Sequence, residues 1–232
     1  MAMRAHTADP VWLFDLDNTL YPHSCRLFDQ IDRRMGAFVQ DFLRLDAEEA
    51  RRVQKRYLRE HGTTLNGLMR VHGLDPRDYL DYVHAIDLTP VAPNAQLDAA
   101  LAALPGRKLI YTNGSEGHAA RVLERLGIAR HFEAVFDIVA ADYEPKPERA
   151  PFERMLRRHA VPAERGHFFD DMPRNLAPAA ELGMTTVWVE SDSEWATLGH
   201  SGDEPFVHHR TADLTGWLQA QAEPHRNRAG GA

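Results

Sequence analysis

Two aspartates close to the start of the chain have a spacing that suits metal-assisted chemistry. Residues 11–15 form an apolar run of strand length that ends in Asp15, and Asp17 follows two residues later. Side chains at the carboxyl end of a strand in a parallel sheet reach the crevice where ligands bind. Two carboxylates this close repel each other unless a cation or a shared proton relieves them, and Mg²⁺ is the usual partner of an all-oxygen site.

Three further groups of polar residues each follow a predicted strand. Thr112 and Asn113 end the run 108–112, Lys146 lies in a Pro-Lys-Pro segment after the run 135–140, and Asp170 and Asp171 end the run 167–171. Because the carboxyl ends of parallel strands lie along one edge of a sheet, we expect these groups to meet Asp15 and Asp17 there. This combination indicates phosphoryl transfer.

The residue types suggest a division of labour. Asp15 is the natural nucleophile, since a carboxylate can attack phosphorus and form an aspartyl-phosphate. Asp17 is placed to protonate the leaving oxygen and later to take a proton from water. Lys146 supplies a fixed positive charge for the developing negative charge. Thr112 and Asn113 are expected to hold the phosphoryl oxygens. The predicted Mg²⁺ environment comprises Asp15, Asp17 through its backbone carbonyl, Asp170 and Asp171.

The elements that must position these groups alternate between strand and helix. An α/β fold with a doubly wound, Rossmann-like, mostly parallel sheet is therefore predicted. Between residues 21 and 90 the apolar spacing is helical and no strand is evident, so this stretch is predicted to be a helical insert. The predicted strands are 11–15, 108–112, 135–140, 167–171, 185–189 and 206–208, and a final helix is predicted over 214–218. The predicted domains are a core of 11–20 and 91–220, an insert of 21–90, and flexible termini of 1–10 and 221–232.

Composition narrows the class of protein. The chain has 232 residues, 44% of them hydrophobic, enough for one core domain with a smaller insert. Its formal net charge of −7 argues against binding nucleic acid or an anionic membrane through bulk charge. A single cysteine, Cys25, excludes an intrachain disulfide, and no secretory signal or membrane-spanning run is visible. The prediction is a soluble cytoplasmic enzyme acting on a small molecule, with an oligomeric state that the sequence leaves open.

The motifs resemble those of the haloacid dehalogenase-like hydrolase superfamily, and residues 21–90 resemble its type 1 cap. Further segments are similar to the pyrimidine 5′-nucleotidase family: Tyr21-Pro22, His61-Gly62-Thr63-Thr64, Thr112-Asn113-Gly114 and Asp170-Asp171 with Asn175. This resemblance implies an Mg²⁺-dependent phosphatase of nucleoside monophosphates such as UMP or CMP. It also implies that Asp171 ligates the metal directly and that Asp170 supports it from outside the ligand shell.

Substrate selection is expected to come from the cap, where His61, Thr63 and Thr64 form a plausible contact loop. The same core would also serve a phosphoglycolate or sugar-phosphate phosphatase or mutase. A dehalogenase is disfavoured because the residue at the position of Asp17 is not normally Asp in that class. A phospho-accepting receiver domain of a signalling protein uses similar residues, but its acid pair follows the first strand and its acceptor comes later. The remaining histidines are predicted to have surface or packing roles.

Overall fold

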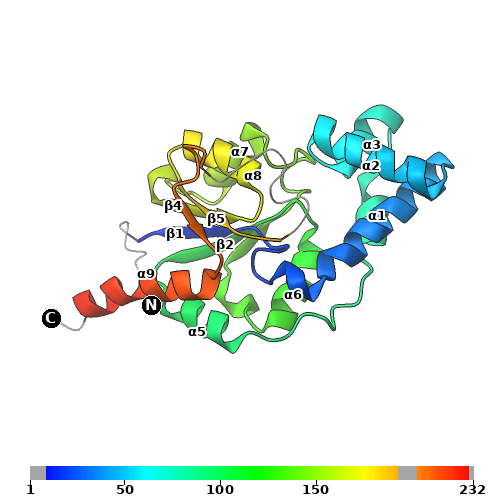
Figure 1. Ribbon diagram of the computed structural model, residues 1–232. Coiled ribbons are helices and arrows are strands. Elements are labelled where there is room, and N and C mark those ends of the chain that lie inside the picture. Colours follow the sequence, from blue (N-terminus) through cyan, green and yellow to red (C-terminus); the bar gives the residue numbers. More distant parts are fainter. Residues whose placement is uncertain (1–8, 193–202, 230–232) are drawn as a thin grey trace.

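The computed structural model describes residues 9–192 and 203–229 and shows a sheet flanked by helices, with a helical cap beside it (Figure 1). The sheet has six strands in the order β3-β2-β1-β4-β5-β6, and neighbouring strands are parallel. The strands are β1 (Val11–Phe14), β2 (Arg107–Tyr111), β3 (Ala134–Phe136), β4 (Gly166–Asp170), β5 (Thr185–Val189) and β6 (His209–Thr211). The predicted doubly wound parallel fold is confirmed.

Strand β1 lies in the middle of the sheet because its apolar side chains are buried on both faces. It pairs with β2 on one side and β4 on the other, so Phe14 aligns with Ile110 and Phe169. Trp12 and Phe14 pack into one hydrophobic core, while Val11 and Leu13 pack into the other. A strand covered on both faces has no need of alternating polar residues, which explains the continuous apolar run.

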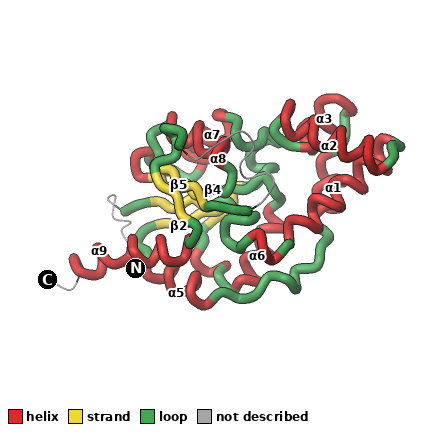
Figure 2. The backbone as a smooth tube through the Cα atoms, viewed as in Figure 1, coloured by secondary structure: helices red, strands yellow, loops and turns green. Residues whose placement is uncertain are grey.

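Helices cover the two faces of the sheet, as Figures 1 and 2 show. The first core contains residues of α5 (Ala95–Ala103), α6 (Glu116–Leu126) and α9 (Leu214–Ala229), and the second contains residues of α7 (Arg149–Arg158) and α8 (Pro173–Glu181). Side chains cap the starts of α5 and α6. Asn94 accepts a hydrogen bond from the Leu97 backbone, and Ser115 accepts one from the His118 backbone.

The cap lies between β1 and α5 in the chain and has a hydrophobic core of its own. Its helices are α1 (Leu27–Leu43), α2 (Ala47–His61), α3 (Thr64–His72) and α4 (Pro76–Val83), preceded by the short turn η1 (His23–Cys25). Buried side chains from all four helices, among them Ile31, Tyr57, Leu68 and Tyr79, make this separate core. The structure therefore contains the helical insertion after the first strand that the sequence predicts.

Three predicted elements differ from those observed. The strand predicted over 135–140 is only Ala134–Phe136, because Asp137 accepts backbone hydrogen bonds from Glu116 and Ala140 and turns the chain away. The strand predicted over 206–208 is a turn, and pairing with β5 begins at His209. The last helix continues to Ala229 rather than ending at Leu218.

The observed order of the acids argues against a receiver domain, in which the acid pair follows the first strand and the phospho-acceptor comes later. Asp15 follows the central strand β1, and Asp170 ends β4 after the cap and two further strands.

A helix long and apolar enough to cross a membrane does not occur within residues 9–192 or 203–229.

Candidate active site

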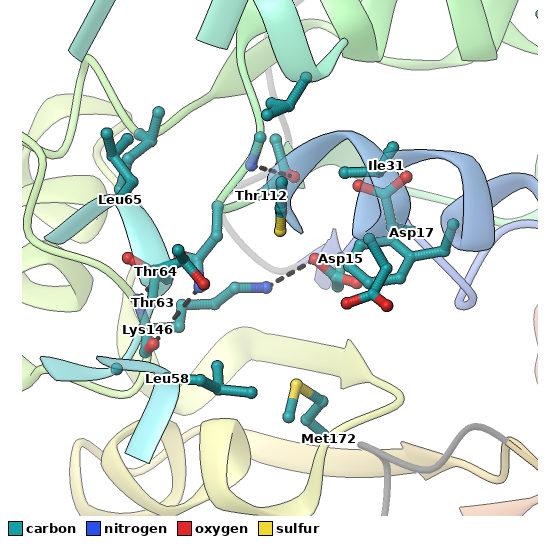
Figure 3. Close-up of a pocket in the computed structure, with 18 of the residues that line it drawn as sticks. Asp15, Asp17, Ile31, Leu58, Thr63, Thr64, Leu65, Thr112, Lys146 and Met172 are labelled. Carbon is teal, nitrogen blue, oxygen red and sulfur yellow. Dashed lines mark hydrogen bonds and ion pairs between the residues drawn. The ribbon is translucent and has the colours of Figure 1, made fainter. Parts of the chain in front are cut away.

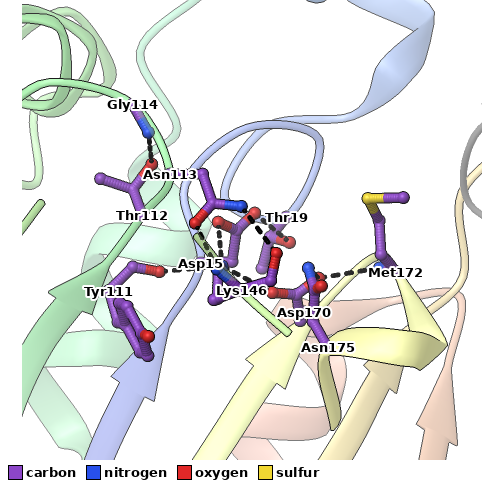
Figure 4. A network of polar contacts seen from close by, with 10 residues as sticks. All are labelled: Asp15, Thr19, Tyr111, Thr112, Asn113, Gly114, Lys146, Asp170, Met172 and Asn175. Carbon is purple, nitrogen blue, oxygen red and sulfur yellow. Dashed lines mark hydrogen bonds and ion pairs between the residues drawn. The ribbon is translucent and has the colours of Figure 1, made fainter. Parts of the chain in front are cut away.

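The polar groups predicted from the sequence come together at the carboxyl edge of the three central strands (Figure 4). Asp15 directly follows β1, Asp170 ends β4, and Thr112 directly follows β2. Lys146 reaches this point from the loop after β3 and forms ion pairs with two of the carboxylates. The expected convergence of these groups is thus observed in the structure.

Lys146 is the buried centre of the network. Its Nζ donates to Asp15 Oδ1 at 2.7 Å, to Asp170 Oδ2 at 2.7 Å and to the Tyr111 carbonyl at 3.0 Å. Burial alone would lower the pKa of Lys146, but the two carboxylates outweigh it and raise that pKa. The lysine is therefore a permanent positive charge at the Asp15 carboxylate.

Asn113 and Thr112 lie at the site but are partly engaged by the protein itself. Asn113 Oδ1 accepts from the Lys146 backbone N–H at 2.8 Å, and its Nδ2 donates to the Lys146 carbonyl at 3.3 Å. Asn113 thus fixes the backbone that carries Lys146. Thr112 Oγ1 accepts from the Gly114 N–H at 2.9 Å and keeps its own proton for a ligand.

The neighbouring acids Asp170 and Asp171 have different environments. Asp170 is fully buried: one oxygen pairs with Lys146, and the other accepts from Asn175 Nδ2 and the Met172 N–H, each at 2.9 Å. No hydrogen bond reaches the Asp171 carboxylate from any residue that the structure describes, although its backbone carbonyl accepts from Trp188 Nε1. Burial, followed by repulsion from Asp170 and Asp15, raises the pKa of Asp171 well above its usual value.

These acids fit a divalent cation. One carboxylate oxygen from each of Asp15, Asp170 and Asp171 lies within 4.8 Å of the others, and all three residues are buried. Burial raises the pKa of Asp15, Lys146 opposes this, and Asp170 and Asp17 add to it. A hard cation with oxygen ligands would relieve this repulsion, and the unpartnered Asp171 carboxylate is the ligand most ready to accept it.

Asp17 is held by two donors. Its Oδ1 accepts hydrogen bonds from the Tyr21 hydroxyl and from His118 Nε2, the latter at 2.9 Å. Burial would raise the pKa of Asp17, but the interactions with His118 and Tyr21 outweigh it and lower that pKa. His118 was expected to be a packing residue. Its position three residues after the cap Ser115, on the first turn of a helix that starts at this edge, is the signal that could have identified it.

A cavity of about 160 Å³ lies between cap and core, and the acids form part of its wall (Figure 3). Its core wall includes Asp15, Asp17, Thr112, Asn113, Lys146 and Asp171. Its cap wall is mostly apolar and includes Phe28, Ile31, Met35, Leu58, Leu65, Leu80 and Val83. Since the cap forms one side of this space, it can contact whatever group is attached to a bound phosphoryl group.

Only part of the predicted contact loop of the cap, residues 61–64, reaches the cavity with its side chains. Thr63 and Thr64 line the cavity, whereas His61 does not and packs edge-on against the Tyr57 ring at 5.5 Å. Thr63 Oγ1 accepts from the Asn66 N–H and caps α3, and Thr64 Oγ1 donates to the Gln54 carbonyl at 3.4 Å. Both hydroxyls therefore also serve the local structure of the cap.

Arg174 is a cavity residue to which no sequence pattern points. Its Nη2 donates to the Gly62 carbonyl at 3.2 Å and so joins the core helix α8 to the α2–α3 turn of the cap. Gly62 has a φ of +79°, and a Cβ there would lie 3.2 Å from Pro145 Cγ. This glycine lets the turn of the cap lie against the loop that carries Lys146.

The sheet order, the helical insertion and the acids at the strand ends together describe a capped α/β hydrolase. The sequence model of the haloacid dehalogenase-like hydrolase family matches residues 11–183. The chain belongs to this family. The matched range extends from β1 beyond α8 and thus includes the cap and every acid of the site.

Similar proteins carry names that bear on the chemistry. Phosphate metabolism protein 8 of Saccharomyces cerevisiae is 28% identical over 195 residues, which are 76% of this chain but only 60% of the yeast protein. Magnesium-dependent phosphatase 1 of Homo sapiens is 27% identical over 134 residues, 58% of this chain and 72% of the human protein. The solved L-2-haloacid dehalogenase of Xanthobacter autotrophicus has a TM-score of 0.56 at 16% identity, over 94% of this chain and 98% of that chain. The last likeness concerns the fold alone.

Proposed function

We propose that the protein is a Mg²⁺-dependent phosphomonoester hydrolase that acts through an aspartyl-phosphate on Asp15. The observation that carries this proposal is the pair of acids: Asp15 held by Lys146 at 2.7 Å, and Asp17 held separately by Tyr21 and His118. A second acid beside the nucleophile is needed to protonate an ester oxygen, and a halide leaving group needs no proton. The phosphatase named among the similar proteins supports the same reading.

The reaction follows from these positions in two displacements. An oxygen of the Asp15 carboxylate forms a bond to phosphorus, the ester P–O bond breaks, and the leaving oxygen takes a proton from Asp17. A water then attacks the same phosphorus and gives a proton to Asp17, which releases inorganic phosphate and restores the Asp15 carboxylate. Lys146 faces Asp15 throughout and stabilises the negative charge on the transferring group.

The metal would be held by Asp15, Asp171 and the backbone carbonyl of Asp17, with Asp170 occupied in fixing Lys146. Bound Mg²⁺ would neutralise the carboxylates and polarise the phosphoryl oxygens. The charges show why this is needed: four acids (Asp15, Asp17, Asp170, Asp171) face Lys146, which is paired with two of them, and Arg174 of the cavity wall. A phosphate dianion would otherwise enter a site that is already negative.

The lowered pKa of Asp17 keeps its carboxylate ionised, which is the form that can take a proton in the second displacement. In the first displacement it must carry a proton. The approaching phosphate dianion is a like charge and raises the pKa of a neighbouring carboxyl, so substrate binding itself favours protonation of Asp17. One residue can thus serve both steps.

For the substrate, we propose a pyrimidine nucleoside 5′-monophosphate such as UMP or CMP. Support comes from the cap segment that is similar to the pyrimidine 5′-nucleotidases and from the cavity wall. Phe28, Leu58 and Leu65 offer apolar surface suited to a planar ring, and Thr63 and Thr64 offer hydroxyls beside it. A phosphoglycolate or sugar-phosphate phosphatase is the alternative, since the core would be the same and the cap wall also includes the polar residues Asp32, Gln54 and Lys55.

Phosphate release from UMP, CMP, AMP, phosphoglycolate, a hexose phosphate and p-nitrophenyl phosphate tests both levels of this proposal. We expect turnover with Mg²⁺, loss of it with a chelator, and a phosphoryl adduct on Asp15 by mass spectrometry of quenched enzyme. Asp15→Asn should form no adduct. Turnover in a metal-free preparation, or an adduct on another residue, would refute the mechanism. A higher kcat/KM for phosphoglycolate or a hexose phosphate than for UMP would refute only the nucleotide assignment.

A further inference from the structure

His118 is fully buried in the first turn of α6 and contacts two residues of the cavity wall, Asp17 and His84. Its side chain has 0% exposed surface, and its Nε2 lies 2.9 Å from Asp17 Oδ1. Because an ionised carboxylate can only accept, Nε2 is the nitrogen that carries the proton. Tyr21 donates to the same oxygen, Oδ1. Both donors therefore hold one oxygen of Asp17, and no described residue donates to Oδ2, which is left for the reacting atoms.

The position of His118 depends in turn on the cap. The imidazole of His84 stacks on that of His118 with ring centres 4.5 Å apart and planes at 8°. His84 Nδ1 shares a hydrogen bond of 3.0 Å with Ser115 Oγ, the oxygen that caps α6. The Gly114 turn packs beside both rings, since a Cβ there would lie 3.4 Å from His118 Cδ2 and 3.6 Å from His84 Nε2.

His84 belongs to the cap because it ends α4, where its backbone N–H donates to the Leu80 carbonyl. Its own carbonyl accepts from Arg121 Nη2 at 2.6 Å, which ties the end of α4 to the core helix α6. A chain of contacts thus runs from the cap through His84 and His118 to the carboxylate of Asp17. Displacement of the end of α4 would remove the ring that supports His118.

We propose that His118 is a positioning residue that aims Asp17 at the leaving oxygen, and that His84 couples this aim to the placement of the cap. The proposal rests on the phosphatase function proposed above. Loss of His118 should therefore impair only one part of the reaction. A misdirected Asp17 should impair proton transfer to the leaving group, whereas attack by Asp15 and stabilisation by Lys146 are unaffected.

The leaving group provides the readout. An alkyl phosphate such as glycerol 2-phosphate releases a strongly basic alkoxide and needs the proton, whereas p-nitrophenyl phosphate releases a stable phenolate and does not. For His118→Leu we expect kcat/KM to fall about 10- to 100-fold with the alkyl ester, part of the full contribution of an acid–base group, and less than about threefold with the nitrophenyl ester. His118→Gln keeps a donor and should recover part of the loss. His84→Ala should show the same selectivity more weakly.

A matched control lies elsewhere in the core. His131 Nε2 and Asp98 Oδ1 lie 2.7 Å apart and form another histidine–aspartate pair, but outside the site. His131→Leu should therefore leave the ratio of kcat/KM for the two esters unchanged. Equal losses with both esters in His118→Leu and His118→Gln would show a merely structural role, and no loss would show no role. Either result overturns the inference. If the wild-type enzyme with Mg²⁺ releases phosphate from neither of these esters nor from UMP, CMP or the other phosphomonoesters tested above, the proposed function itself fails, which is a distinguishable result.

Discussion

Replacing Asp170 and Asp171 by asparagine, one at a time, should have very different effects on the stability of the metal-free protein. Asp170→Asn removes one of the two carboxylates that balance the buried Lys146. In the wild type both carboxylate oxygens of Asp170 accept hydrogen bonds, one from Lys146 and the other from Asn175 and Met172. Asparagine has only one oxygen, so its NH₂ group must face one of these sets of donors. Two donors then face each other at a fully buried position.

The size of the loss follows from these contacts. Removing one partner of a buried ion pair costs about 3–5 kcal/mol, and Lys146 keeps Asp15, which favours the lower end for the pair itself. An unsatisfied buried donor adds about 1–3 kcal/mol, so we expect a total of about 4–6 kcal/mol. At about 2–4 °C per kcal/mol for a chain of this size, the melting temperature should fall by about 8–24 °C.

Asp171→Asn is the matched control, because it has the same size change one residue away. The Asp171 carboxylate accepts no hydrogen bond from a residue within 9–192 or 203–229, and the change removes a charge that Asp170 and Asp15 repel. The variant should be within about 1 kcal/mol of the wild type, or more stable, because asparagine has nearly the same size and relieves the repulsion between buried carboxylates. In contrast, it should lose the stabilisation by Mg²⁺, which is about 2.7 kcal/mol at a hundredfold excess over Kd.

Thermal and urea unfolding in a chelator and in Mg²⁺, with circular dichroism as the signal, would measure both effects. The reasoning is refuted if Asp171→Asn destabilises the metal-free protein as much as Asp170→Asn does. It is also refuted if Asp171→Asn keeps the full Mg²⁺-dependent rise in melting temperature, because another residue would then be the metal ligand.

Two further predictions concern the cap turn and the pH dependence of stability. Gly73→Ala should lower the free energy of unfolding only by the strain of a positive φ, about 1–2 kcal/mol, since nothing lies within 4 Å of the added Cβ. Gly62→Ala adds the close approach to Pro145 and should also lower kcat/KM. Equal activities in the two variants would exclude a role for this contact. Burial and then His209 lower the pKa of His167 to about 4, below its unfolded value of about 6.5. The unfolded state therefore binds more protons between these values, and stability should fall as pH drops from about 6.5 to about 4. His167→Gln should flatten that fall in unfolding measurements, and an unchanged slope would contradict the assignment.

Some features of this protein follow from local patterns in the sequence. The apolar run before Asp15 predicts the central strand, because a strand buried on both faces needs continuous apolar side chains. Asn94, Ser115 and Asp46 are of the residue types that favour helix starts, and each side chain accepts a backbone hydrogen bond from the first turn of its helix. These interactions span only three residues, so the chain need not be folded for them to be recognised.

The sequence also predicts that Asp15, Lys146 and Asp170 meet, although they are far apart in the chain. The alternation of strands and helices brings successive strand ends to one edge, and this rule holds whatever the detailed packing. The fold class, the helical insertion and the position of the site could therefore be predicted. The end of β3 could not, because it depends on the hydrogen bonds of Asp137 to two separate backbone groups.

Only the tertiary structure decides which partner each polar side chain takes. Asn113 is predicted to hold a phosphoryl oxygen and lines the cavity, but the sequence does not show that its amide also bonds the backbone of Lys146, 33 residues away. Adjacent residues Asp170 and Asp171 have the same chemistry in the sequence, and the packing of Lys146 and Asn175 against only one of them makes them different. The contact of His118 with Asp17 joins residues 101 positions apart. Such contacts depend on distances and angles between separate elements, which no local pattern encodes, and they are decided when the cap and the sheet pack together.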